Sequence, residues 1–198
     1  MKNMCNINHS RNILLYMISC AGGTISGRTA VQKLAYFLSV SNLLPIKFRP
    51  HFYGPYSAEI TEILDQLVEV HILEEKTEKS SSGSSQPIDW KKYQYALTSE
   101  GKLYLEQVTL DSSDKIGINN IVQVCYRETR FDISVLSCAA KVHYIIANYT
   151  GQKLQSEKKF SNENSYEFIQ NMALDLNWKL SDSQITQSFY LLHSLNFL

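Results

Sequence analysis

The chain has 198 residues, with 19 Lys and Arg balanced by 19 Asp and Glu, and 44% of its residues are hydrophobic. Because the formal net charge is zero, the composition excludes the strongly basic class of nonspecific nucleic-acid coat proteins. The hydrophobic fraction excludes a disordered chain and suffices for the cores of one or two domains. Only 8 Gly and 4 Pro are present to separate short strands, so the composition favours a mainly helical fold over a β-sandwich or barrel.

The first 40 residues predict two amphipathic helices. Ser10 is a candidate N-cap for the first, which is expected to end at the glycine pair 22–23, because glycine readily adopts the left-handed backbone that follows a helix. After a short extended segment, the second helix is expected over residues 28–40. Its apolar positions share one face, and Gln32 and Lys33 fall outside that face.

A third helix is predicted to begin beside Ser57, after an aromatic-rich turn over residues 53–56. Its apolar positions recur at helical spacing: Ile60, Ile63, Leu64, Leu67 and Val68. The period then changes to alternation, so residues 71–78 and 91–98 are predicted strands. The Ser-rich segment 79–87 between them predicts a flexible hairpin tip.

Thr98 is expected to cap a further helix that carries Glu100 in its first turn. Three helices followed by a two-stranded hairpin are the order of a winged helix-turn-helix. The fold class predicted for residues 10–108 is therefore a winged-helix domain, mainly α with a small β-hairpin wing.

Residues 112–198 predict a helical C-terminal extension, packed as one unit with the first domain or forming a dimer interface. Apolar spacing indicates helices around residues 116–125, 135–149 and 166–176, and Gly151 is expected to end the second of these. Ser181 and Gln184 have the spacing of a capping box, so the last helix is expected to begin there and run to about residue 193.

The cysteines form no C-x-x-C pair; they are Cys5, Cys20, Cys125 and Cys138. Free thiols are therefore expected, with no zinc or thioredoxin-type motif. The apolar stretch 13–20 superficially resembles a lipoprotein signal that ends at Cys20, but it is short for that role, and no run is long enough to cross a bilayer. We expect a cytoplasmic protein with no metal, no other cofactor and no membrane partner.

Three motif segments are distinctive. They are Gly27-Arg28-Thr29 with Gln32-Lys33-Leu34 and Tyr36-Phe37-Leu38, then His51-Phe52-Tyr53-Gly54-Pro55-Tyr56-Ser57, and Tyr95-Ala96-Leu97-Thr98-Ser99-Glu100-Gly101. With these motifs, residues 10–108 resemble the YwgA-like family of prokaryotic winged-helix proteins and, more distantly, the Panacea antitoxin domain and the C-terminal domain of the DarG antitoxin. The resemblance implies a nucleic-acid-binding or partner-binding role and brings no catalytic residues.

The central motif has a structural interpretation, which covers His51, Tyr53, Gly54, Pro55 and Tyr56. Glycine relaxes the backbone restriction, and the proline that follows it has its own φ fixed near a helical value, so this pair is expected to turn the chain sharply into the third helix. The rings of the motif, with that of Phe52, are expected to pack beneath the turn rather than contact a ligand.

A catalytic site is not predicted, so the chain is not expected to be an enzyme. Its five histidines are dispersed, and neither a glycine-rich phosphate loop, an H-E-x-x-H pair nor a nucleophile elbow occurs.

The charges are unevenly distributed along the chain. Residues 1–56 carry six Lys or Arg and no carboxylate, whereas residues 57–78 carry seven acidic residues and one Lys. The exposed side of the third helix would show Glu59, Glu62, Asp65, Gln66 and Glu69. Such a helix would be repelled by the phosphates of duplex DNA. Complementarity between neighbouring helices explains this pattern equally well.

The favoured hypothesis is a recognition module that binds a partner protein with a basic surface, such as a toxin, a nuclease or another nucleic-acid enzyme. The alternative is a DNA-binding transcriptional regulator that uses its basic side. The residues of that side are Arg28, Lys33, Arg49, Lys79, Lys91 and Lys92. Of these, Arg28 and Lys33 are expected to be solvated, with contact to a phosphate or carboxylate left open.

Overall fold

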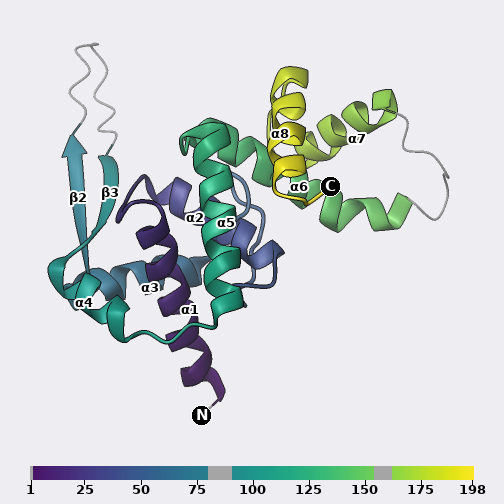
Figure 1. Ribbon diagram of the computed structural model, residues 1–198. Helices are drawn as coiled ribbons and strands as arrows, with labels where there is room; N and C mark the ends of the chain where they lie inside the picture. Colours follow the sequence, from purple (N-terminus) through teal and green to yellow (C-terminus); the bar gives the residue numbers. More distant parts are fainter. Residues whose placement is uncertain (1, 80–90, 154–161) are drawn as a thin grey trace.

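The computed structural model describes the backbone of residues 2–79, 91–153 and 162–198, and the side chains of residues 8–77, 93–149 and 166–198. It is mainly helical with one small antiparallel sheet, as predicted (Figure 1). The elements are α1 (Lys2–Cys20), β1 (Thr24–Ser26), α2 (Arg28–Val40), α3 (Ala58–Glu69), β2 (Leu73–Lys79), β3 (Lys91–Leu97), α4 (Ser99–Gln107), α5 (Ser112–Thr129), α6 (Ile133–Lys153), α7 (Asn162–Asp175) and α8 (Asp182–Ser194).

The first helix extends further towards the N-terminus than predicted. It begins at Lys2, and Ser10, the expected cap, lies inside it with 1% of its surface exposed. No proline or glycine precedes Ser10 to interrupt the helix. Its end is confirmed: Gly22 and Gly23 have φ angles of 86° and 81°, and the N–H of Gly23 donates to the carbonyl of Ile18 over 2.9 Å.

The sheet contains the predicted hairpin and a third strand. Its order is β1-β3-β2, all antiparallel, and the hairpin pairs Leu73 with Leu97 and Lys79 with Lys91. Tyr95 of β3 is fully buried and anchors the sheet on the helices. Beyond Lys79, the predicted tip lies outside the described residues.

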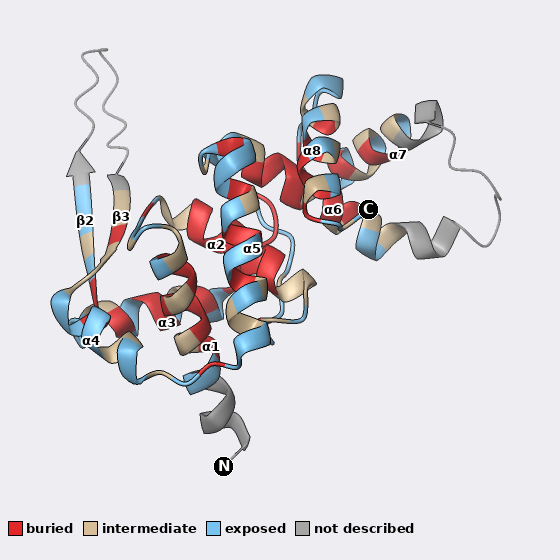
Figure 2. Cartoon of the chain, in the orientation of Figure 1, coloured by how far each residue is buried: buried red, intermediate tan, exposed pale blue. Residues whose placement is uncertain are grey.

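The C-terminal helices pack directly on α1 and α2. α5 lies against α1 and α2, and α6 lies between α2 and α8, so buried side chains from both halves of the chain join one hydrophobic cluster (Figure 2). The hairpin and the α7–α8 pair lie at opposite ends of the molecule (Figure 1). Within the described ranges, no helix combines the length and apolarity that a bilayer crossing requires.

Of two predictions for the ends of the C-terminal helices, one is confirmed and one is wrong. The capping box of α8 is confirmed, since Ser181 and Gln184 exchange the expected hydrogen bonds. The expected end of α6 at Gly151 is wrong, because the helix continues to Lys153. A single glycine costs a helix about 1 kcal/mol, which the apolar positions of α6 that precede it outweigh.

α4 begins with the predicted cap, in which the hydroxyl of Thr98 accepts the N–H of Gly101 over 2.9 Å. This turn packs so closely on the chain after α3 that a Cβ at Gly101 would overlap the carbonyl oxygen of Ile72. That oxygen is backbone and cannot rotate away.

We expect Gly101→Ala to lower the free energy of unfolding by about 1–3 kcal/mol, because the added methyl group forces the backbone apart. Ser99→Ala, at an exposed position of the same turn, should change it by less than about 0.5 kcal/mol. Urea unfolding followed by circular dichroism measures both. Equal effects of the two substitutions would contradict the close packing.

Candidate functional site

The motif over residues 51–57 forms a tight loop between α2 and α3. Arg49 and Tyr56 pair through two backbone hydrogen bonds of 2.9 Å, and the N–H of Gly54 donates to the carbonyl of His51 over 2.9 Å. Gly54 has a φ of 95°, which favours glycine, and a Cβ there would approach the Cγ of Lys141 to 3.1 Å. The predicted turn-forming role of Gly54 is therefore confirmed.

Two polar side chains of α2 hold this loop. The Nζ of Lys33 donates to the carbonyl of Pro55 over 2.6 Å. Gln32 binds Ser57 twice, donating to its carbonyl over 2.8 Å and accepting its N–H over 3.0 Å. The prediction that Lys33 is solvated is wrong, since only 1% of its surface is exposed. The loop covers this side of α2 and presents backbone groups that require polar partners.

The amine of Lys33 lies in an unfavourable environment for its charge. Burial, and then the nearby amine of Lys141, lower the pKa of Lys33 to about 7. Burial also lowers the pKa of Lys141. Among the residues with described side chains, no carboxylate forms an ion pair with either amine. Lys33 is therefore a buried amine whose charged form is paired with no anion of the described chain.

A pocket of about 180 Å³ opens above Lys33. Its lining comes from α2, the loop and α3: Arg28, Thr29, Gln32, Lys33, His51, Tyr53, Tyr56, Thr61 and Leu64. The four α2 residues form two pairs spaced four apart, 28 with 32 and 29 with 33, so they lie on one face of the helix in successive turns.

The aromatic residues of the motif do not pack beneath the loop as predicted. His51 is exposed, as are Phe52 and Tyr53, with 67% and 49% of their surfaces accessible, and Tyr56 is half-buried. The space beneath the loop is taken by Lys33 and by Trp178, whose Nε1 donates to the carbonyl of His51 over 2.7 Å. Sequence reasoning did not identify Trp178, because it lies far along the chain.

Arg28 forms a charged cluster at the rim of the pocket. It donates to the hydroxyl of Tyr95 over 2.6 Å and to the carboxylates of Glu75 and Asp65 over 2.9 and 3.4 Å. Its guanidinium lies 4.4 Å from the ring centre of Tyr93. Burial opposes the charged form of Glu75, yet hydrogen bonds from Tyr95 and Arg28 lower its pKa. Arg28 is thus held by its neighbours rather than free in solvent.

The structure places Glu59, Glu62, Asp65, Gln66 and Glu69 together on the exposed side of α3, and we call this set the acidic face. Cations of the described chain contact two of its five members: Asp65 binds Arg28, and Gln66 accepts from Arg11 over 3.1 Å. Among the described side chains, no ion pair involves the three glutamates, which extend from the first turn of α3 to its last residue. Intramolecular complementarity therefore accounts for only part of the acidic face.

The residues of the alternative, basic set are not brought together in the same way. Lys33 is buried and Arg28 is paired, whereas Arg49 is exposed. Lys79, Lys91 and Lys92 belong to the hairpin strands, but their side chains lie outside the described part of the structure. The described residues also hold no group of three His, Cys, Asp or Glu arranged to bind a metal ion.

Comparison with known proteins assigns the chain to a family. It is 30% identical over 156 residues to the uncharacterized protein YwgA of Bacillus subtilis (strain 168), which covers 75% of this chain and 86% of that protein. The chain belongs to the YwgA-like family. No family model matches the sequence. In this YwgA-like chain, the first two motifs meet in space, because Gln32 and Lys33 of one hold the backbone of the other.

The pKa of Lys33 makes stability depend on pH. Its pKa is about 7 in the folded chain and 10.5 without perturbation, so between these values the unfolded state binds the additional proton. The free energy of unfolding should therefore rise with pH in this interval, by at most about 1.4 kcal/mol per unit.

We expect the wild type to gain stability relative to Lys33→Met between pH 7 and 10, and the difference to be constant below pH 6. Urea unfolding at each pH measures it. The other titratable groups around the pocket, Arg28, His51, Tyr53, Tyr56 and Lys141, are present in both proteins and largely cancel. A difference that stays flat up to pH 10 would show that Lys33 keeps an ordinary pKa.

Proposed function

We propose that the chain is a non-enzymatic recognition module of the winged-helix type, which binds a basic surface of a partner protein on its acidic face. The observation that carries this proposal is that the three glutamates of that face form no ion pair among the described side chains. Glu59, Glu62 and Glu69 are exposed, and cations of the described chain contact only Asp65 and Gln66.

The order of elements supports the winged-helix assignment. The sequence α1-β1-α2-α3-β2-β3 with sheet order β1-β3-β2 is typical of winged helices. In such domains the third helix is the recognition helix and the hairpin is the wing. α3 therefore corresponds to the helix with which a winged helix contacts its ligand. Its exposed side is negatively charged, as nucleic acid is, whereas a DNA-reading helix is normally positively charged.

A basic protein surface suits this arrangement. Opposite charges accelerate association and exclude wrong partners, and a rigid helix holds its carboxylates in a fixed pattern. Arg11 and Arg28 hold Gln66 and Asp65 of the acidic face in place. A toxin, nuclease or other nucleic-acid enzyme has such a basic surface at its substrate site. The resemblance to the Panacea and DarG antitoxin domains supports the same antitoxin-like role.

The double charge reversal Glu62→Lys with Glu69→Lys tests the acidic face, because neither residue forms an ion pair within the described side chains. We expect it to abolish capture of basic partners from native lysate while the melting temperature changes by less than about 2 °C. The matched control is Glu167→Lys with Asp175→Lys, which makes the same change in net charge at exposed positions of α7.

Affinity capture with quantitative mass spectrometry compares the three proteins, and surface plasmon resonance then measures the association rate of each partner lost. That rate should fall at least tenfold in the reversal variant at low salt, and less at 0.5 M salt, because screening weakens exposed charge pairs. The same bound proteins in all three samples would show that the acidic face is only a solvated surface.

The alternative function, reading of duplex DNA, predicts the opposite charge dependence. We expect weak binding of the wild type to a fluorescent duplex at 0.15 M salt, and severalfold tighter nonspecific binding when Glu59, Glu62 and Glu69 are changed to Gln. Fluorescence anisotropy measures both. Tight wild-type binding with a steep salt dependence, weakened by Arg49→Ala, would instead support the DNA-binding regulator.

A further inference from the structure

The pocket above Lys33 has a different character from the acidic face beside it. Among the groups that line it are the basic side chains of Arg28, Lys33 and His51, and none of the lining residues is a carboxylate. Asp65 and Glu75 reach Arg28 at the rim but do not line the pocket. In a protein with no net charge, a pocket whose only charged lining groups are basic requires a physical explanation.

Lys33 has unused capacity to bind an anion. An ammonium group has three N–H donors, and only the carbonyl of Pro55 accepts from this one within the described structure. The amine of Lys141 approaches from α6, so two positive charges repel each other around Gly54. A buried charge without a counter-ion is strongly destabilising, and an anion bound in the pocket would offset that cost for Lys33.

Further donors around the pocket are also free. The hydroxyl groups of Thr29 and Tyr53 and the ring nitrogens of His51 make no hydrogen bond among the described residues. They come from two different elements and surround the same space. The first turns of α2 add the positive end of the helix dipole. Several donors converging on one small space are the arrangement that binds a tetrahedral oxyanion.

We propose that this pocket binds the phosphate group of a small phosphorylated molecule, with Lys33 as its main charge partner. Its volume of about 180 Å³ is small, which suits one phosphate group and the first part of its ester. The exposed rings of Phe52 and Tyr53, 4.9 Å apart, stand beside the opening and offer an apolar contact to the rest of the ligand. The proposal is independent of partner docking, since it does not use the acidic face.

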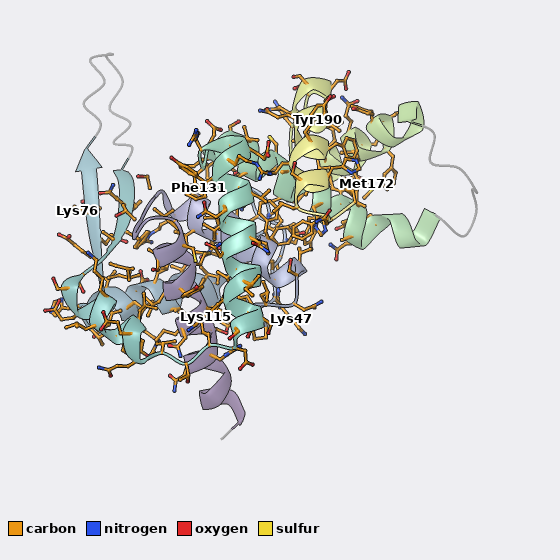
Figure 3. The ribbon with its side chains drawn as sticks, viewed as in Figure 1. Lys47, Lys76, Lys115, Phe131, Met172 and Tyr190 are labelled. Carbon is orange, nitrogen blue, oxygen red and sulfur yellow. The ribbon has the colours of Figure 1, made fainter. Side chains whose placement is uncertain are left out.

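Isothermal titration calorimetry at pH 6.5 tests the pocket with three probes: inorganic phosphate, phenyl phosphate and benzoate. We expect saturable binding of both phosphates at micromolar to millimolar concentration, with phenyl phosphate bound more tightly and benzoate at least tenfold more weakly. Lys33→Met should weaken both phosphates at least tenfold. Lys47→Met is the control, since Lys47 is exposed and projects from the segment after α2, outside the pocket (Figure 3).

Tyr53→Phe provides a second variant that does not endanger folding, because Tyr53 is half exposed. It should weaken phosphate binding severalfold, and amide chemical shifts of the wild type should change around Lys33 and Gly54 when phosphate is added. The affinity for phenyl phosphate should also fall between pH 6.5 and 9 as Lys33 loses its proton, because a phosphate monoester, with a second pKa of about 6, stays mostly doubly charged over this range. Absence of saturable binding to the wild type, equal affinity of Lys33→Met, or preference for benzoate would each overturn the proposal.

Discussion

The hydrogen bond from Lys33 to the carbonyl of Pro55 is the contact on which the architecture around α3 depends. It draws the loop onto α2, and the two bonds between Gln32 and Ser57 fix the residue at which α3 begins. Position 54 favours glycine because its φ is 95° and because a Cβ there would come within 3.1 Å of the Lys141 stem. Lys33 and Gln32, on adjacent positions of α2, thus hold the loop that leads into α3, and both line the pocket.

α3 separates two surfaces of opposite charge. Its exposed side forms the acidic face, whereas Thr61 and Leu64 on another side line the cationic pocket. Arg28 lies between them and binds Asp65 of the acidic face and Glu75 of the hairpin at once. Because Asp65 and Glu75 neutralise its charge, Arg28 adds little net charge to either surface. The two proposed binding events therefore use adjacent surfaces with separate sets of charges.

The helices and the hairpin could be predicted because their signals are local. The apolar stripe of α2 gave its bounds at residues 28–40, and the caps at Thr98 and Ser181 lie where the spacing places them. The early start of α1 was missed, since Ser10 has the chemistry of a cap but faces the core. Local patterns identify an element well and its first residue less well.

The pocket could not be predicted, because its main hydrogen bonds join a helix to a distant loop and leave no periodic pattern in the sequence. A helical wheel counts Lys33 as polar and places it in solvent, although a neighbouring loop can bury a lysine by supplying a carbonyl acceptor. The pair Gln32-Lys33 in one motif and Gly54-Pro55 in the other were both visible in the sequence. Only the structure shows that the long side chains of the first motif donate hydrogen bonds to backbone carbonyls of the second.

The hydrogen bond from Trp178 to the carbonyl of His51 joins residues 127 positions apart. During synthesis on the ribosome, α2 and α3 leave the exit tunnel well before Trp178 is translated, so the loop first forms without this support. At a typical rate of about 5–20 residues per second, the nascent chain waits several seconds for it. The loop beside the proposed pocket therefore gains this support only after the segment that carries Trp178 has been made.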